Sequence, residues 1–256
     1  MKSSKLFRTL ILFVLILLIG GCATTKNPDP LETMNRGIYK FNTVVDDAVL
    51  KPVAKGYKAV APSFVVKGIN NFFNNLRDVI TVINDLLQFK IKHAANDAGR
   101  VALNSTVGLL GFVDVHSMSG GERRKEDFGQ TLGHWGVGSG AYLVIPFFGP
   151  SSIRDGVGLV ADTLYFDPIS YITDVRTRNQ VRLAQFTDAR TELLNASDIL
   201  EEASIDPYAF QRDAYIQYRQ GLVEDADGST VDYSDENLLS DGFKPYSDDE
   251  IVSLTN

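Results

Sequence analysis

Apolar residues first form a continuous run near the start of the chain and then recur at helical spacing. Residues 10–19 (LILFVLILLI) are apolar without interruption, follow a basic segment and precede two glycines. A helix of that length rises about 15 Å, which is about half of the hydrocarbon core of a bilayer. This order of segments predicts a secretory signal peptide over residues 1–21 and disfavours a membrane-spanning helix.

An amphipathic helix is predicted after the signal peptide. Asp29 and Pro30 have the chemistry of an N-cap and a first helical residue. Apolar residues then recur every three or four positions, as on one side of a helix. They are Leu31, Met34, Ile38, Phe41 and Val45.

A longer helix is predicted from Pro62 to Leu87, where the apolar positions form two neighbouring stripes. The stripes consist of Val65, Ile69, Phe72, Leu76, Val79, Ile83 and Leu86, and of Val66, Phe73, Ile80 and Leu87. We expect a face this wide to pack mainly on a protein core. Contact with lipid is the alternative.

Further helices are predicted in the second half of the chain, where apolar periodicity follows capping residues. Ser152 with Asp155 indicates a capping box, and Asp206 before Pro207 indicates another helix start. The predicted helices span residues 93–110, 152–163, 176–202 and 207 onward.

Glycine is concentrated between these helices. Residues 108–149 hold ten of the 21 glycines, which indicates tight turns or a flexible backbone. The apolar run over residues 142–148 favours a strand, but Pro146 confines it to an edge or an irregular segment. The pattern as a whole predicts a mainly α-helical protein with one glycine-rich insertion.

Charge is unevenly distributed along the chain. The net charge is −7, and residues 221–256 contain ten acidic residues and one basic residue. The part between the signal peptide and this tail is therefore close to neutral, which disfavours nucleic-acid binding, because that needs a basic face. The tail composition predicts disorder. Its role is either solubility or docking to a basic partner.

The only cysteine, Cys22, directly follows the apolar run and its two glycines. The sequence Ile-Gly-Gly-Cys resembles a bacterial lipobox, in which the thiol is acylated and the chain is cut before it. Ala23, rather than Asp, follows, and this indicates sorting to the outer membrane. A lone cysteine excludes an intrachain disulfide and a cysteine-based metal site. We predict that Cys22 is a lipid anchor and that residues 22–28 are a tether.

Motifs of catalysis are incomplete in this sequence. His93, His116 and His134 are scattered and lack the spacing of metal ligands. The segment Gly-Ser-Gly at 138–140 lacks the outer glycines of a nucleophile elbow. We therefore predict no metal, no cofactor and no enzymatic activity. Trp135 is the only tryptophan, and it favours either a small local core or a membrane interface.

Three stretches resemble one known family. The first is DPLETMNRGIYKFN at residues 29–42, and the second is FGQTLGHWGVGSGAYL at residues 128–143, continuing through Pro146, residues 149–151 and Arg154-Asp155. The third contains Asp206-Pro207-Tyr208, Arg212, Ala214-Tyr215 and Arg219. Together with the lipobox, these residues resemble the MlaA (VacJ) family of outer-membrane lipoproteins. The resemblance defines a domain over residues 29–220, and the acidic tail at 221–256 lies outside it.

The resemblance implies both an architecture and a function. It implies a mainly α, ring-like bundle of amphipathic helices with a glycine-rich hairpin insertion, lying in the inner leaflet of the outer membrane on its periplasmic side. It implies association with a trimeric porin and a channel that removes mislocalised phospholipids from the outer leaflet. A periplasmic lipid-carrier protein would then take the phospholipids for retrograde transport, so that lipid asymmetry is maintained.

Candidate site residues follow from this hypothesis. The glycine-rich insertion is expected to line or gate the channel through Gly133, Gly136, Gly138, Gly140 and Tyr142. Candidate headgroup contacts are Arg77, Arg100, Arg123, Arg124 and Lys125. Candidate membrane-facing residues are Phe72, Phe73, Ile80 and Trp135. Two alternative functions remain, namely a structural or porin-assembly lipoprotein and a periplasmic lipid hydrolase.

Overall fold

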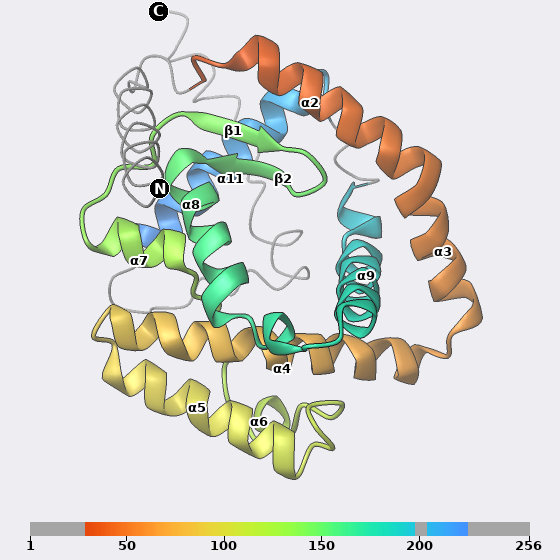
Figure 1. Cartoon of the computed structure of the whole chain (residues 1–256), viewed down its shortest axis with the longest axis vertical. Helices are drawn as coiled ribbons and strands as arrows, with labels where there is room; N and C mark the ends of the chain where they lie inside the picture. The colour runs from red at the N-terminus through yellow and green to blue at the C-terminus, as the bar shows by residue number, and fades with distance from the viewer. Residues whose placement is uncertain (1–28, 198–203, 225–256) are drawn as a thin grey trace, which may run out of the picture. The chain divides into compact units, whose positions relative to one another are not determined.

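The computed structural model describes residues 29–197 and 204–224 (Figure 1). The predicted signal peptide, the Cys22 anchor, the tether and residues 225–256 of the acidic tail lie outside the described residues. Within the described ranges, no helix has the length and apolar character needed to cross a membrane.

The described residues are mainly helical, as the sequence predicts. Their first half contains α2 (Glu32–Val45), the π-helical turn η2 (Asp46–Leu50), α3 (Lys51–Val60), α4 (Ser63–Leu87), α5 (Ile91–Thr106), α6 (Val115–Met118) and α7 (Phe128–His134). Their second half contains β1 (Tyr142–Ile145), β2 (Gly149–Ser152), α8 (Ile153–Ala161), η3 (Asp162–Phe166), η4 (Pro168–Tyr171), α9 (Val175–Glu192) and α11 (Pro207–Glu224).

Helix boundaries agree with the capping residues in most places. The hydroxyl of Ser152 accepts a hydrogen bond from the amide of Asp155 at 3.1 Å, and Asp206 accepts one from the amide of Ala209 at 3.2 Å. Two expectations are corrected. Asp29 does not cap α2, because the chain turns before Glu32 and the carboxylate is buried. Helix α11 continues to Glu224, past the predicted boundary at residue 220.

Contacts among the helices close into a circuit, as Figure 1 shows for this part of the chain. Helices α2, η2 and α3 follow one another, and α9 contacts both α3 and α4. Helix α7 contacts α4 and α8, and β1 contacts both α8 and α2, which completes the circuit. Helix α5 lies along α4, and α11 packs on α7 and β2. The predicted ring-like bundle of helices is therefore confirmed.

Strands β1 and β2 form an antiparallel hairpin in which Tyr142 pairs with Ser152 and Ile145 with Gly149. The first strand ends at Ile145, directly before Pro146, as expected for a residue that cannot donate to a ladder. The glycine-rich segment around the hairpin is more regular than its composition suggests. It includes α7, which begins at Asp127 because that carboxylate caps the amide of Gln130 at 2.9 Å.

Two asparagines of α2 cover the outer edge of β1. Asn35 donates to the carbonyl of Tyr142 at 3.0 Å and accepts from the amide of Val144 at 2.9 Å. Asn42 donates to the carbonyl of Ile145 at 3.0 Å and accepts from the amide of Phe147 at 2.8 Å. Residues seven apart lie on one face of a helix, so the two amides substitute for a third strand and protect the edge.

A small apolar core lies at the base of this hairpin. Tyr142, Val144 and Tyr208 are buried against one another, and side chains of α2 and α11 pack on them. The phenol of Tyr208 also donates a hydrogen bond to the carboxylate of Asp29. Residues from the three stretches that resemble the family therefore meet here, around the start of β1.

Candidate functional site

Polar side chains occupy most of the buried positions of α4, whereas most of its apolar side chains are half-buried. Its buried residues are Gly68, Phe73, Asn75, Asp78, Thr81, Asn84 and Asp85. Of the two predicted apolar stripes, only Phe73 is buried. The expectation that this wide apolar face packs mainly on a core holds for Phe73 alone, since Leu86 is exposed and the other residues of the stripes are only half-buried.

The same inversion extends over the described part of the chain. Large apolar side chains are exposed at the ends of α3, α4 and α5, where Val60 is 87 % exposed, Phe64 76 % and Phe89 80 %. Exposed apolar side chains of this size are unfavourable in water, and where they gather on a surface they mark contact with a membrane or another protein. Buried polar groups with many mutual hydrogen bonds are the complement expected of such a protein.

Among residues 29–197 and 204–224, four apolar residues occupy a left-handed backbone conformation, and all four are exposed. They are Phe89 at φ 61°, Leu109 at 53°, Leu110 at 60° and Phe147 at 67°. This conformation is unfavourable for bulky residues. In water, neither the strained backbone nor the exposed apolar side chain would be favourable at these turns. Contact of the side chains with an apolar partner would compensate for both costs.

A carboxylate in the middle of α4 holds two of the predicted headgroup contacts. Asp78 accepts from Nε of Arg100 at 3.0 Å and from Nε of Arg123 at 2.9 Å. Arg100 also pairs with Asp114. Nε of Arg124 lies 3.5 Å from Asp97. These guanidinium groups are thus brought together with acidic partners inside the protein, and Arg100 is only 2 % exposed.

The other two predicted headgroup contacts, Arg77 and Lys125, form none of these ion pairs with Asp78, Asp97 or Asp114. Arg77 donates to Asn74 at 3.1 Å, and burial, followed by the nearby charge of Arg123, lowers the pKa of Arg77. Lys125 is exposed.

A pair of aspartates lies between α4 and α5. Asp85 and Asp97 are both almost fully buried, and both oxygens of Asp85 and one of Asp97 have no hydrogen-bond donor among the described residues. Burial and then the neighbouring Asp97 raise the pKa of Asp85 to about 8. A proton held on Asp85 and donated to Asp97 supplies one of the missing donors.

A further ionic cluster joins α7, α8 and α11. Arg219 donates from Nε to Asp155 at 3.0 Å and from Nη1 to Asp127 at 2.6 Å. Asp155 also accepts from the phenol of Tyr215 at 2.7 Å and from Nε of Arg154 at 2.9 Å. Burial opposes ionisation of Asp155, but the bonds and charge of Arg219 outweigh it and lower its pKa to about 2.

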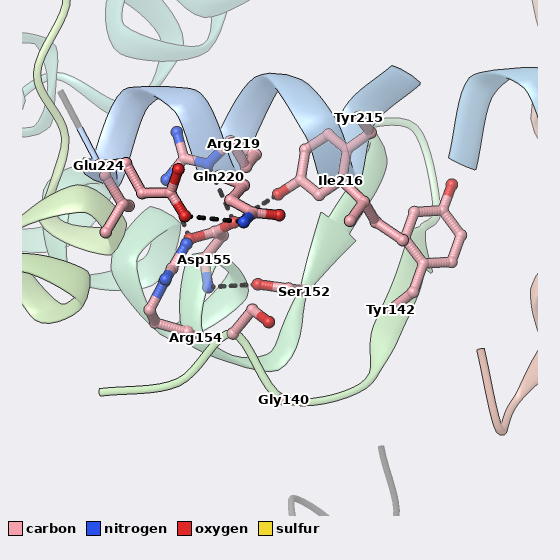
Figure 2. Close-up of a pocket in the computed structure, with 12 residues that line it drawn as sticks. Gly140, Tyr142, Ser152, Arg154, Asp155, Tyr215, Ile216, Arg219, Gln220 and Glu224 are labelled. Atoms are coloured by element: carbon pink, nitrogen blue, oxygen red, sulfur yellow. Dashed lines mark hydrogen bonds and ion pairs between the residues drawn. The ribbon is translucent and has the colours of Figure 1, made fainter. Parts of the chain in front are cut away.

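A pocket of about 200 Å³ opens beside this cluster (Figure 2). It is lined by residues of the hairpin, of α8 and of one face of α11. Two of the residues predicted for the channel, Gly140 and Tyr142, contribute to it. Figure 2 shows Arg154 and Asp155 of α8 next to Arg219, Gln220 and Glu224 of α11, so charged side chains of both helices gather in one part of the pocket.

The predicted gating glycines have different roles in the fold. Gly133 is a close-packing residue, because a methyl group there would lie 2.8 Å from Cγ2 of Val223 and 2.9 Å from Nη1 of Arg154. Gly136 and Gly140 have positive φ angles of 87° and 70°, which favour glycine. Gly138 has neither a positive φ nor a neighbour within 4 Å. Of the four, Gly138 is the one that the fold does not require.

The predicted membrane-facing residues differ in how deeply they are buried. Phe72 and Ile80 are half-buried, and Trp135 is 50 % exposed, with its indole donating to the carbonyl of Leu87 at 3.2 Å. Phe73 is 4 % exposed and stacks edge-to-face on Phe72, so it is an interior residue and the prediction is wrong for it.

Sequence reasoning missed the ionic cluster, although most of its residues lie in the quoted motifs. Asp127 directly precedes the second stretch, Arg154 and Asp155 end it, and Arg219 ends the third stretch. The signal was the presence of arginines and aspartates in stretches far apart in sequence. Nothing in the local spacing indicated that they meet.

Comparison with known proteins adds independent evidence. Residues 27–222 match the model of the MlaA lipoprotein family. The intermembrane phospholipid transport system lipoprotein MlaA of Haemophilus influenzae is 34 % identical over 236 residues, which cover 88 % of this chain and 93 % of that protein. The protein of the same name from Escherichia coli K12 is 31 % identical over 236 residues, covering 89 % and 93 %.

One solved structure is also similar, and it was described as the structural basis for maintenance of bacterial outer membrane lipid asymmetry. It is 34 % identical, with a TM-score of 0.67, and the match covers 76 % of this chain and 98 % of that chain.

Proposed function

We propose, from the premise that this chain belongs to the MlaA lipoprotein family, that it removes mislocalised phospholipids from the outer leaflet of the outer membrane. It passes them to a periplasmic lipid-carrier protein for retrograde transport. Its relatives are lipoproteins of an intermembrane phospholipid transport system, and the solved structure concerns outer-membrane lipid asymmetry. The protein thus moves phospholipid without breaking covalent bonds.

The inverted polarity of α4 is the observation that most strongly supports this function. Its buried side carries Asn75, Asp78, Thr81, Asn84 and Asp85, and its apolar stripes are mostly half-buried. A helix with this arrangement is suited to an apolar environment, with a polar protein interior behind it. We infer that the helices lie in the inner leaflet of the outer membrane. The interior can then receive the polar part of a lipid.

The anchor and the partners complete the proposal. Acylation at Cys22 holds the protein on the periplasmic side of the outer membrane, because several acyl chains give stable anchoring. A trimeric porin covers part of the exposed apolar surface, and the carrier receives the lipid from the periplasmic side. Gly136, Gly138 and Gly140 supply the motion of the loop before the hairpin that opens the path.

The test is a measurement of outer-leaflet phospholipid with a membrane-impermeant amine label. A deletion strain is compared with the same strain expressing the wild-type protein or Cys22→Ala. We expect excess label in the deletion strain, which the wild type corrects and the unanchored variant does not.

Other outcomes separate the alternatives. Normal labelling together with lowered porin would favour a porin-assembly lipoprotein. Release of fatty acid or headgroup from phospholipid vesicles by the purified protein would favour a lipid hydrolase.

A further inference from the structure

Arg154 in α8 is a buried arginine with unused hydrogen-bond donors. The residue is 7 % exposed, and its Nε donates to Asp155 at 2.9 Å. Among the described residues, Nη1 and Nη2 donate to no acceptor. Arg219 beside it is different, because its Nε, Nη1 and Nη2 all bind Asp127 or Asp155. Neither nitrogen is among the fully buried polar atoms that lack a partner, so both reach solvent and are open to an acceptor from a ligand.

The free end of Arg154 lies at the pocket. Arg154 lines it together with Ser139, Ser152, Gln220 and Glu224. Gly133 leaves room for Nη1, since a side-chain carbon there would lie 2.9 Å from that nitrogen. Ser152 uses an oxygen lone pair to cap α8, so its hydroxyl proton is still available to a ligand. These donors face a space that is large enough for a small polar group.

The charged side chains in and around the pocket indicate which charges a ligand should carry. The carboxylates of Asp127 and Asp155 are balanced by the guanidinium groups of Arg154 and Arg219. Glu224 adds one further negative charge to the lining of the pocket, where it accepts a hydrogen bond from Gln220 at 2.7 Å. A simple anion would meet donors at Arg154 and repulsion at Glu224. A ligand that carries a cation next to its phosphate would bind both groups, with the phosphate at Arg154 and the cation at Glu224.

The pocket also has an apolar border. Tyr142, Ile216 and Val223 line it beside the polar groups. At about 200 Å³ it is smaller than the roughly 300–1,000 Å³ of pockets that enclose drug-sized ligands. It can hold a headgroup while acyl chains remain outside, on the apolar border.

We propose that this pocket binds the zwitterionic headgroup of a phospholipid, with the phosphate on Arg154 and the ammonium group on Glu224. The inference rests on the proposed function, which it deepens by naming a binding site and the charge type of the headgroup. Arginine suits the phosphate because its fork can donate two parallel hydrogen bonds to phosphate oxygens.

The experiment uses the full-length lipoprotein in detergent and short-chain lipids below their micelle concentration. Dihexanoyl phosphatidylethanolamine, dihexanoyl phosphatidylglycerol and inorganic phosphate are titrated, and binding is followed by ³¹P NMR line broadening. We expect the wild type to bind the ethanolamine lipid most tightly. Inorganic phosphate should not displace it, because that ion lacks the cation.

Two variants and a control test the two contacts separately. Arg154→Gln should weaken binding of both lipids about tenfold or more, as expected for loss of a charge-assisted pair. Glu224→Gln changes an exposed side chain, so it should fold, and it should reduce the preference for the ethanolamine lipid without weakening the glycerol lipid. Arg182→Gln is the matched control, because Arg182 binds Ser170 at 2.7 Å on η4 and is not among the residues that line the pocket. Circular dichroism checks folding.

The results separate this inference from the proposed function. Wild-type affinity in both pocket variants, or full displacement by inorganic phosphate, would overturn the headgroup site. Full correction of outer-leaflet labelling by Arg154→Gln in the deletion strain would also overturn it, and would leave the proposed function intact. A deletion strain with normal labelling would instead contradict the proposed function, and the titrations alone would then decide the site.

Discussion

The side-chain amide of Asn35 donates a 3.0 Å hydrogen bond to the backbone carbonyl of Tyr142, 107 residues further along the chain. Asn35 is fully buried, and its amide group also binds Asp29 at 2.8 Å and the amide of Val144 at 2.9 Å. One asparagine therefore joins the start of the described chain, α2 and the hairpin. The position of the hairpin beside the pocket depends on this contact.

Asn35→Ala is expected to destabilise the protein more than removal of an exposed asparagine. It leaves the Tyr142 carbonyl and the Val144 amide unpaired in a buried site, which costs about 2–6 kcal/mol for the two groups together. Asn71→Ala is the control, since that exposed amide makes a single 3.1 Å bond to Phe112. Urea unfolding in detergent, followed by Trp135 fluorescence, measures both. Equal losses for the two variants would contradict the structural role of Asn35.

Gly129→Ala is expected to disrupt the ionic cluster. The added methyl group would lie 2.6 Å from Oδ1 of Asp155 and 2.8 Å from Nη2 of Arg219, so the buried pair would have to separate. Breaking a buried pair costs about 3–5 kcal/mol when one partner is removed, and partial separation should cost a substantial part of that. Gly99→Ala, with no neighbour within 4 Å, is the control. A stability equal to that of the control would show that the cluster relaxes freely.

Gly138→Val tests the proposed gate without a folding penalty. Gly138 has no positive φ and no atom within 4 Å of an added Cβ, so the variant should unfold at nearly the wild-type urea concentration. A β-branched residue stiffens the backbone, and we expect slower correction of outer-leaflet labelling in the deletion strain. Transport at the wild-type rate in a correctly folded variant would remove Gly138 from the gate.

The Asp85–Asp97 pair predicts a pH dependence of stability. Burial and then Asp97 raise the pKa of Asp85 in the folded protein to about 8, with Glu126 adding to the effect and Lys90 opposing it. An unfolded aspartate has a pKa of about 3.9. The protonated form is thus favoured by folding, and its stabilisation is present below about pH 4 and is lost as the pH rises toward 8. The slope approaches at most about 1.4 kcal/mol per pH unit.

Asp85→Asn should remove this slope, because an amide donates to Asp97 at every pH. The free energy of unfolding is measured between pH 5 and pH 8 for the wild type, for this variant and for Asp47→Asn, which changes an exposed carboxylate in η2. The difference between Asp85→Asn and the wild type should grow with pH. A constant difference would show that Asp85 is ionised throughout the range.

Phe89→Asn tests the contact of the exposed turns with lipid. Phe89 is 80 % exposed at φ 61°, and asparagine tolerates this backbone conformation better than phenylalanine. Stability should therefore be unchanged or slightly higher, while vesicle binding of a Cys22→Ala background should fall several-fold. Gln180→Asn on the exposed side of α9 is the control. Unchanged flotation with vesicles would argue that this turn does not contact lipid.

The sequence by itself determined the position of the long helix, the end of the first strand and the family to which the chain belongs. The long helix was expected from Pro62 to Leu87 and spans Ser63–Leu87, and the first strand stops before Pro146. These features follow from local rules, namely apolar periodicity, capping side chains and the missing amide of proline. The residues that resemble the family were likewise visible in the chain.

Only the tertiary structure decided which face of each helix is interior and which charges meet. Periodicity shows that α4 has an apolar side, but the same stripe suits a protein core and an apolar surrounding equally well. The pairing of Arg219 with Asp127 and Asp155, 92 and 64 positions away, depends on how α7, α8 and α11 pack. The free donors of Arg154 likewise depend on its neighbours in space. Such contacts arise from long-range packing, which no local pattern encodes.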